Sequence, residues 1–530
     1  MCKLLKFSNS YIDLGEKFFQ QVLPQKAPKP ELLLWNVELA NSLSITKKEQ
    51  NDHHVLAQYF SGNKLPEGAQ SIALAYSGHQ FGHFNPKLGD GRAHLLGEVL
   101  DRSDVLRDIQ LKGSGQTPFS RRGDGKCALA PALREYIMSE ALYALGAPTS
   151  RCLAVVSTGE VINRGMTKAG AVVTRVASSH IRVGTFQYFA ARGDLSSLKL
   201  LLDYSIERHF PELNNKKSTQ EQRILLFLEK VTEKQITLII EWLRIGFIHG
   251  VMNTDNTAIC GETLDFGPCA MMGSYDEKAV FSSIDEYGRY AFGEQGNIAQ
   301  WNMARLADCL LPLLVDCFKK EAFDKEFPDK ACSEKELQQQ ALTKIEVVIH
   351  QYTAKFEQVY YAMYAKKLGM SGVNSKNKAL IKDLLAIMQT EALDYTITFY
   401  RLTQSLTEET IATKLKGELG QWYGDWLLAL ENEKHNVNSK QAVLEQAQLL
   451  MKKNNPVVIP RNHYVEKILE RCEDIISNSS TQCTVHESIY EIVEAFLLVL
   501  RSPYDELATT KNYQDTPDDK DKYYQTFCGT

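Results

Sequence analysis

Oxygen-bearing side chains occur in two short segments of this chain, and their types suit a site that binds a divalent cation. Asn256 ends the segment HGVMNTDN at 249–256, and Asp265 opens DFGP at 265–268. Carboxylate and amide oxygens are ligands that magnesium accepts, and phosphate oxygens and water can complete its octahedron. Asp255 is the only carboxylate of the first segment, so it could take a proton from an incoming hydroxyl. The alternative is that these residues only form turns.

A lysine and a glutamate upstream could bind phosphates. The segment LRDIQLKGSG predicts a strand with Ile109 on one face and Gln110 and Lys112 on the other. Glu135 follows on a helix predicted at 128–146 from its apolar spacing. If this helix packs against the strand, Glu135 pairs with Lys112 and holds its ammonium against nucleotide phosphates. A lysine that merely covers the sheet with its aliphatic stem is an equal alternative.

Further cations accompany glycine turns. The segment RRGDGK at 121–126 and the pair Arg175 and Arg182 could bind phosphate, because Arg does so bidentately and amides in Gly turns cradle anions. The two arginines could share one face if their segment is helical. Solvated surface charge is the alternative for each arginine. The chain lacks a Gly-x-x-x-x-Gly-Lys-Ser/Thr motif, which excludes a Walker-type nucleotide site.

Two regions of different character must position these side chains. Between about 70 and 177, turn residues alternate with short apolar runs, which predicts strands near 95–100, 151–158 and 169–177. From about 184 onward, apolar residues recur every three or four positions, which predicts long helices. Three of these helices are predicted at 237–248, 298–318 and 378–402.

The order of these parts is typical of a protein-kinase fold: a Gly-rich turn, a strand Lys, a helix Glu, then an Asn and an Asp-Phe-Gly in a helical region. We therefore predict an α+β, two-lobed protein-kinase-like fold. Its parts are a small sheet-rich N-lobe at 1–183, a large mostly helical C-lobe at 184–502, and an exposed or weakly ordered polar tail at 503–530. However, Val251 occupies the position at which a kinase has its catalytic Asp. The alternative is an unrelated α+β enzyme.

Composition limits the class of protein. The chain has 530 residues, 44% of them hydrophobic, which predicts an enzyme-sized protein of two or more packed units. A formal net charge of -5 gives no basic footprint, so we expect no nucleic-acid partner. The N-terminus shows no signal pattern and no long apolar run occurs, so we expect a cytoplasmic protein with no membrane span. No Cys-x-x-Cys pair occurs, which favours buried, reduced thiols over a zinc site.

Longer motifs carry a more specific resemblance. They include YSGHQFGHFNPKLGDGRAHLLGE, QLKGSGQTPFSRRGDGKCALAPALREYIMSEAL, VVTRVASSHIRVGTF and FIHGVMNTDN, together with GRYAFGEQGNIAQWNMARLADCLLPL. With these motifs the chain resembles the selenoprotein O family over about 70–315, and again at 455–469. Members of this family have a kinase-like fold that lacks the usual kinase base. The resemblance implies that ATP binds in an inverted orientation and that AMP passes to Ser, Thr or Tyr hydroxyls of other proteins, with release of pyrophosphate.

The resemblance also implies roles for particular residues. Asp255 would be the catalytic proton acceptor, and Asn256 with Asp265 would bind Mg²⁺, or Mn²⁺ in its place. Glu135 would orient Lys112. The implied nucleotide contacts are Gly89, Gly91, Arg92, Lys112, Asp124, Gly125, Glu135, Arg175, Arg182 and Asp265. The inverted nucleotide would present its α-phosphorus to the acceptor, so Val251 would not need to act as a base.

Other functions remain open at this stage. They are UMP transfer from UTP with manganese, a protein kinase with a relocated base, and a nucleotide-binding scaffold without catalysis. The expected partners are ATP and the proteins that are modified. Cys528 stands where other members of the family carry selenocysteine, and a regulatory disulfide between Cys528 and another thiol is a further hypothesis.

Overall fold

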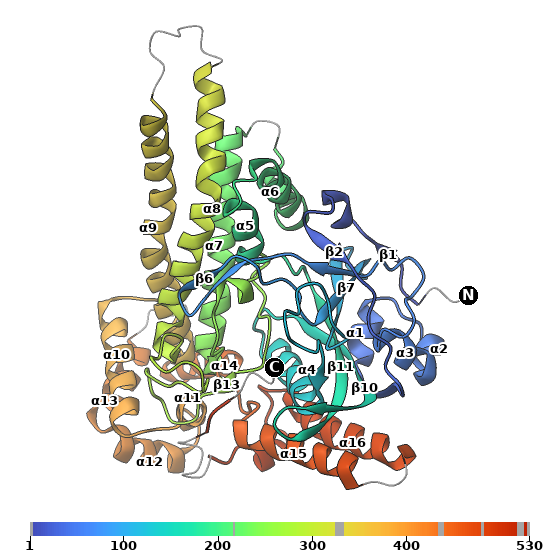
Figure 1. Ribbon diagram of the computed structural model, residues 1–530. Helices are drawn as coiled ribbons and strands as arrows, with labels where there is room; N and C mark the ends of the chain where they lie inside the picture. Colours follow the sequence, from blue (N-terminus) through green and yellow to red (C-terminus); the bar gives the residue numbers. More distant parts are fainter. Residues whose placement is uncertain are drawn as a thin grey trace.

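The computed structural model has a sheet-rich N-terminal lobe and a mostly helical C-terminal lobe (Figure 1). It describes residues 4–215, 218–323, 333–432, 439–478, 482–516 and 524–526. Most strands lie in the N-terminal part, and helices dominate from Val183 onward. The predicted α+β fold, with a sheet-rich N-lobe and a mostly helical C-lobe, is confirmed.

An antiparallel sheet forms the N-lobe, in the order β2-β4-β7-β8-β11-β10-β3, with β1 paired to β7 and β9 to β11. The strands of the main path are β2 (Phe19–Gln21), β4 (Ile72–Leu74), β7 (Ala93–Leu100), β8 (Leu106–Lys112), β11 (Thr167–Ala177), β10 (Arg151–Asn163) and β3 (Glu31–Trp35). The other elements of this lobe are β1 (Phe7–Ser8), β9 (Cys127–Ala128), η1 (Ile12–Leu14), α1 (Val37–Ser42), α2 (Lys47–Gln50) and α3 (His53–Phe60).

The strands predicted near 95–100, 106–112, 151–158 and 169–177 are confirmed as β7, β8, β10 and β11. In the register of the sheet, Lys112 lies opposite Ala93 on one side and Val173 on the other. The side chains of Ile109 and Leu111 lie on one face of β8 and are fully buried in the core. Lys112 alternates to the opposite face, as the period of a strand requires.

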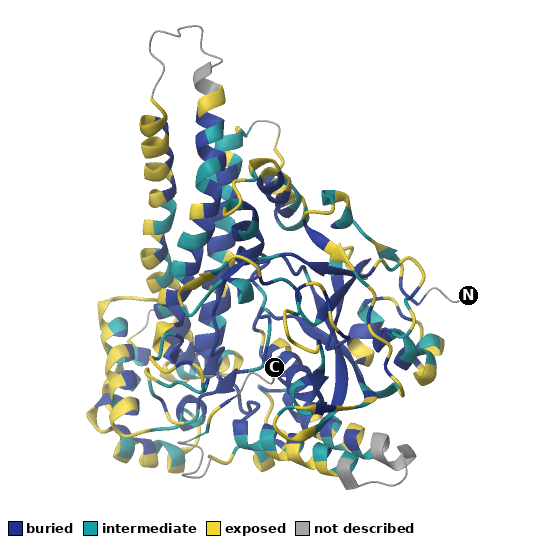
Figure 2. Ribbon diagram, viewed as in Figure 1, coloured by how far each residue is buried: buried dark blue, intermediate teal, exposed yellow. Residues whose placement is uncertain are grey.

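Helix α4 (Leu129–Ala144) confirms the helix predicted at 128–146 and packs against β10 and β11. Gly146, with φ of 86°, follows its end in the left-handed region that favours glycine. On its other side α4 contacts α15 (Asn462–Asn478) and α16 (Gln482–Leu500), which lie beside the N-lobe in Figure 1. Figure 2 shows that α4 and the sheet behind it are almost entirely buried.

Long helices build the C-lobe, and α7, α8 and α9 pack side by side. The helices before α15 are α5 (Val183–Ala190), α6 (Leu195–His209), α7 (Gln220–Ile245), α8 (Gln295–Phe323), α9 (Glu334–Lys367), α10 (Ser375–Thr390), α11 (Tyr395–Ser405), α12 (Glu409–Leu419), α13 (Gln421–Glu431) and α14 (Lys440–Asn454). Short 3-10 turns are η2 (Pro211–Leu213), η3 (Thr254–Asn256), η4 (Phe292–Glu294) and η6 (Thr510–Tyr513). The helix predicted at 298–318 is confirmed as part of α8.

Two predicted helices have different bounds in the structure. The helix predicted at 237–248 ends at Ile245, because Gly246 adopts φ of 76° and caps the helix. Phe247–Ile248 instead forms strand β12, which pairs with β13 (Ala270–Met271). The prediction of one helix at 378–402 is wrong, because α10 and α11 are separate. Asp394 accepts a hydrogen bond from the amide of Ile397 and starts the second helix.

The β12–β13 pair places the two predicted metal-binding segments next to each other. His249 follows β12, is buried, and its Nε2 donates to the Leu264 carbonyl at 2.9 Å. Gly250 has φ of 82°, and a Cβ on this residue would lie 2.6 Å from the Pro268 carbonyl oxygen. Only glycine therefore allows the two loops to approach this closely.

Part of the C-terminal tail is anchored to the C-lobe. The Thr526 amide donates to the Phe281 carbonyl at 2.7 Å, and its hydroxyl donates to the Pro268 carbonyl at 2.6 Å. Most residues of 503–516 are exposed, but Thr510 is buried. Cys528 lies outside the described residues, so the proposed disulfide is not addressed.

Other expectations concern the cysteines and the helices. Buried free thiols occur as predicted at Cys127, Cys152, Cys260, Cys269, Cys309 and Cys472, and Cys317 is buried as well. Within the residues that the structure describes, no helix has both the length and the apolar character needed to cross a bilayer.

We expect Gly250→Ala to lower the free energy of unfolding by about 2 kcal/mol, because Ala is strained at positive φ and its methyl group meets the Pro268 carbonyl. Urea denaturation measures this change. Gly417→Ala is the control, since Gly417 is an exposed position of α12 with open space around it, and Ala there should stabilise by about 0.5 kcal/mol. Equal stabilities of the two variants would contradict the close approach of the two loops.

Candidate nucleotide-binding and catalytic cleft

A cleft of about 630 Å³ lies between the sheet of the N-lobe and the loops that follow β12. The structure brings nearly all the predicted site residues to its walls: Gly89, Gly91, Arg92, Lys112, Asp124, Gly125, Arg175, Arg182, Asp255, Asn256 and Asp265. Glu135 is the exception, because it lies buried behind Lys112 on α4. Residues that are far apart in the sequence therefore form one site.

Four charged side chains form a buried network at the back of the cleft. The Lys112 ammonium lies 2.7 Å from Glu135 Oε2 and 2.7 Å from Asp265 Oδ1. Arg175 Nη2 donates to the same two oxygens at 3.0 and 3.2 Å, and Arg175 Nε also donates to Glu135. The pairing of Lys112 with Glu135 that the sequence suggested is present. Arg175 as a second cation of this pair could not be inferred from spacing.

This network keeps both carboxylates ionised. Burial alone would raise the pKa of Asp265, but Lys112 and Arg175 outweigh burial and hold this pKa well below its usual range. Burial likewise acts on Glu135, and Arg175 and Lys112 bring its pKa below the ordinary value. Because Lys112 is shared between Glu135 of α4 and Asp265 of the C-lobe, the network ties the two lobes together across the cleft.

Asp255 has a different environment, in which burial outweighs the nearby Arg182. Burial raises the pKa of its carboxyl to about 6, although Arg182 and a hydrogen bond from Gln80 act to lower it. Gln80 Nε2 donates to Asp255 Oδ2 at 3.1 Å. Asp255 Oδ1 is buried and receives no hydrogen bond from the described residues. A carboxylate with such a pKa and a spare acceptor atom can take a proton near neutral pH.

The hairpin of β5 (Gly78–Gln80) and β6 (His83–Asn85) holds the loop that carries Asp255. The His79 amide donates to Thr254 Oγ1 at 2.7 Å, and the Phe81 amide donates to Asn253 Oδ1 at 3.1 Å. A Cβ at position 78 would lie 2.6 Å from Asp255 Oδ1, so the strand approaches the carboxylate at a glycine. No role was assigned to Gln80 from the sequence, although the motif YSGHQFG contains it.

Asn256 and Asp265 can offer oxygens to a cation. Asn256 Nδ2 donates to the Val251 carbonyl at 3.0 Å, which leaves its Oδ1 as an acceptor on the cleft side. The contacts of Asp265 with Lys112 and Arg175 use Oδ1, so Oδ2 remains for a metal. Among the described residues, no three His, Cys, Asp or Glu side chains gather as a metal site. The arrangement fits magnesium, which is often held by one or two protein oxygens plus phosphates and water.

Arginines from two different elements line the cleft. Arg175 lies on β11 and Arg182 caps α5, so they do not share a helical face, yet both point into the cleft. The Arg182 guanidinium lies 3.3 Å from Asp90 and 4.3 Å from the centre of the Tyr76 ring. These two contacts fix the position of the Arg182 guanidinium. The guanidinium is therefore preorganised to bind an anionic or aromatic group of a ligand.

The glycine turns form the rim of the cleft. Gly125 has φ of 70°, and a Cβ there would overlap the backbone of Gly115. Asp124 pairs with both guanidinium nitrogens of Arg164 at 2.8 Å, so Asp124 holds the turn rather than standing free. Arg164 also lines the cleft and was missed in the sequence, because it lies in the loop between β10 and β11, far from the motifs used.

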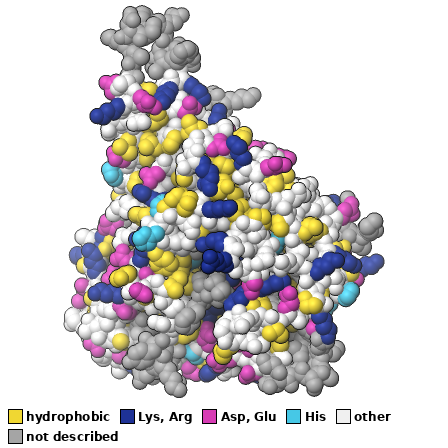
Figure 3. Space-filling view, in the orientation of Figure 1, with side chains coloured by type: hydrophobic (Ala, Val, Ile, Leu, Met, Phe, Trp, Pro, Cys, Tyr) yellow, Lys and Arg dark blue, Asp and Glu magenta, His cyan; other side chains and the backbone are white. Residues whose placement is uncertain are grey.

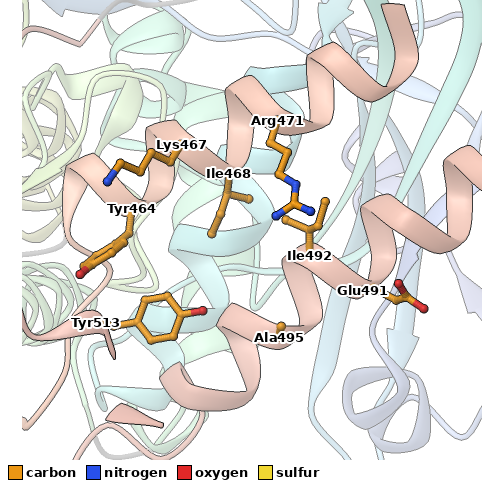
Figure 4. Close-up of a pocket in the computed structure, with 8 residues that line it drawn as sticks. All are labelled: Tyr464, Lys467, Ile468, Arg471, Glu491, Ile492, Ala495 and Tyr513. Carbon is orange, nitrogen blue, oxygen red and sulfur yellow. The ribbon is translucent and has the colours of Figure 1, made fainter. Parts of the chain in front are cut away.

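A second groove, between α15 and α16, does not offer comparable chemistry (Figure 4). Its volume is about 330 Å³. The floor is apolar, with Ile468, Ile492 and Ala495, and the polar lining contains Lys467, Arg471 and Glu491 but no pair of oxygen ligands. The central cleft is therefore the candidate site.

The chain is similar over nearly its whole length to known proteins. The chain is 46% identical over 526 residues to a protein nucleotidyltransferase YdiU of Teredinibacter turnerae, covering 99% of this chain and 100% of that protein. It is 46% identical over 520 residues to the protein of the same name from Pseudoalteromonas translucida, covering 98% and 99%. The relative from Bacillus mycoides is 45% identical, with 98% of each chain covered.

With its kinase-like lobes and its cation-lined cleft, the chain is an enzyme of the protein nucleotidyltransferase class, and its substrate is a nucleotide. A family model described as "Protein adenylyltransferase SelO" matches residues 2–490. The chain belongs to this family, and the resemblance found in the sequence is confirmed.

We expect Glu135→Gln to lower the free energy of unfolding by about 3 kcal/mol, because it leaves two buried cations to share one carboxylate. Urea denaturation provides the measurement. The matched control is Glu229→Gln, which removes a half-exposed ion pair with Lys355 and should change stability by less than about 1 kcal/mol. A Glu135→Gln protein as stable as the control would show that the network contributes little to holding the lobes.

Proposed function

We propose that this protein transfers AMP from ATP to a Ser, Thr or Tyr hydroxyl of other proteins and releases pyrophosphate. The observation that carries this proposal is the position of Asp255. It is a carboxylate with a pKa near neutrality in the same cleft as the Lys112 network, whereas the kinase base position holds Val251. A base at Asp255 suits attack at a different phosphorus from the one a kinase uses.

In the proposed step the acceptor oxygen attacks the α-phosphorus of ATP. A new bond forms between this oxygen and the α-phosphorus, and the bond from the α-phosphorus to the bridging oxygen breaks. Asp255 takes the hydroxyl proton, and pyrophosphate leaves with the electron pair of the broken bond. Gln80 holds the carboxylate in place through its hydrogen bond to Oδ2.

The cations of the cleft would hold the nucleotide. Lys112, Arg175 and Arg182 would neutralise phosphate oxygens, and Arg92 beside Gly91 would add a further contact from the rim. Asn256 and Asp265 would bind a magnesium or manganese ion, which neutralises charge on the phosphates when it is bound. Positioning and charge neutralisation account for most of the catalysis of phosphoryl-type transfers.

Three other functions are tested by the same experiment. UMP transfer from UTP with manganese would use the same phosphate contacts as AMP transfer and would differ in the nucleobase of the nucleotide. A protein kinase would move the γ-phosphoryl group instead, and Val251 argues against it. A nucleotide-binding scaffold would bind ATP without transferring any part of it.

We expect α-labelled ATP, but not γ-labelled ATP, to label protein covalently when the enzyme is incubated with magnesium and a whole-cell protein extract. Asp255→Asn should reduce this labelling by about 100-fold or more while nucleotide binding is retained, because the proton acceptor is lost. Asp316→Asn, on the outside of α8, is the matched control. Retention of the γ label would indicate a kinase, no label would indicate a scaffold, and stronger labelling by α-labelled UTP with manganese would indicate UMP transfer.

We expect EDTA to abolish transfer and added Mg²⁺ or Mn²⁺ to restore it. Asp265→Asn should weaken Mn²⁺ binding in the presence of ATP by about 10-fold or more, because a carboxylate ligand is lost. Electron paramagnetic resonance of Mn²⁺ measures this binding without relying on activity. If Asp265→Asn bound Mn²⁺ as tightly as the Asp316→Asn control, Asp265 would not be a metal ligand.

A further inference from the structure

The β5–β6 hairpin connects Asp255 with an exposed surface of the C-lobe. Gln80 at the end of β5 contacts the Asp255 carboxylate, and Phe81 donates its amide to the Tyr290 hydroxyl at 3.1 Å. Tyr290 in turn donates to Asn253 Oδ1 at 2.6 Å. The tip of the hairpin and the segment 283–290 are therefore held together beside the candidate proton acceptor.

Apolar side chains on these two segments are turned toward solvent. Tyr287 is 94% exposed, Ile284 50% and Phe84 40%. Figure 3 shows hydrophobic, histidine and cationic side chains gathered on the middle of this face, around the position of β6 in Figure 1. Exposed apolar side chains that gather next to a catalytic cleft indicate a surface that binds another molecule.

Arg289 gives this surface its charge. Its guanidinium lies 4.8 Å from the centre of the Trp301 ring and 3.8 Å from the position that a Cβ on Gly82 would occupy. The Arg289 side chain contacts the Tyr290 hydroxyl, but among the described residues no carboxylate pairs with it, and its Nε is buried without a partner. The neighbouring Arg305 differs, because it pairs with Asp308 at 3.1 Å.

The Arg289 guanidinium is therefore preorganised to bind a carboxylate. Contact with the Trp301 ring restrains the guanidinium, so less side-chain freedom is lost when it binds an anion. The acidic residues on the same segment do not satisfy it, because Asp285 is buried and accepts the backbone amides of Arg289 and Tyr290. Glu286 is exposed and forms no ion pair with a described residue.

The distance to the cleft sets which part of an acceptor would meet Arg289. Gln80 contacts Asp255, and Gly82 at the hairpin tip contacts Arg289, so the two sites lie within roughly 20 Å. An extended chain covers roughly 3.3 Å per residue. A residue within about six positions of the modified hydroxyl could therefore reach the guanidinium.

We propose that the surface formed by Phe84, Ile284, Tyr287, Arg289 and Trp301 docks an extended segment of the acceptor protein that carries Asp or Glu near the modified hydroxyl. Arg289 binds the carboxylate, and the exposed apolar side chains cover the adjacent part of the segment. This inference rests on the proposed function, since it needs the acceptor hydroxyl to reach Asp255. It names a class of substrate, acidic acceptor segments, that the site itself does not specify.

The test compares three synthetic peptides of the same length, each with one central Ser. One carries Asp and Glu on both sides of the Ser, one carries Lys at these positions, and one carries Gln. The measurement is covalent incorporation from α-labelled ATP with magnesium. We expect the wild-type enzyme to label the acidic peptide at least 10-fold faster than the Lys peptide, with the Gln peptide between them.

Charge reversal at Arg289 tests the assignment. Arg289→Glu should favour the Lys peptide over the acidic peptide, and Arg289→Ala should reduce the preference to less than 2-fold. Arg471→Glu, at the remote groove of Figure 4, makes the same change in net charge and should behave as wild type. ATP binding and the temperature of unfolding, measured on each variant, should match those of the wild type.

Two results would overturn the proposal, and they can be told apart. Equal labelling of the three peptides by the wild type, or an acidic preference that survives in both Arg289 variants, would exclude docking at this surface but leave AMP transfer intact. Absence of the α label from every peptide and from the extract proteins would overturn the proposed function and the docking surface with it.

Discussion

The shared ion pairs of Lys112 are the interaction on which the rest of the site depends. A single ammonium contacts Glu135, on a helix of the N-lobe, and Asp265, on a loop of the C-lobe. Arg175 repeats both contacts from a neighbouring strand. Two buried cations, a buried carboxylate and a partly buried one would each be costly alone, so the lobes must close in the arrangement that pairs them. This requirement fixes the width of the cleft that we propose as the nucleotide site.

The two halves of the proposed chemistry lie in contrasting surroundings. Asp265 sits among cations that keep it ionised, which suits a metal ligand, whereas burial raises the pKa of Asp255, which suits a proton acceptor. The loop that carries Asp255 is held by Gln187 of α5 and Asn302 of α8. The β5–β6 hairpin adds contacts from Gln80, His79 and Phe81, so the N-terminal region also helps to set the geometry of a residue in the C-lobe.

The same hairpin gives the enzyme an exposed surface beside the site. Its inner side contacts the loop that carries Asp255, and its tip lies against Arg289, which lies over the Trp301 ring. Chemistry and acceptor recognition would thus share one short element, with the proton acceptor on one side and the docking surface on the other. The cleft itself, by contrast, is lined by groups that suit phosphates and carries little that could distinguish one protein acceptor from another.

The sequence by itself determined the types of chemistry and the local elements. Turn glycines, strand alternation and helical spacing are local properties, so β7, β8, β10, β11 and α4 could be predicted, and the motifs named most of the cleft residues. Contacts between distant segments decided the rest. The sequence did not show that Arg175 joins the Lys112 network, that Gln80 binds Asp255, or that Arg164 holds Asp124. The break between α10 and α11 was also missed, because Asp394 as a cap competes with a continuous helical pattern. Pairing and burial depend on which side chains meet in space, and only the tertiary structure decides that.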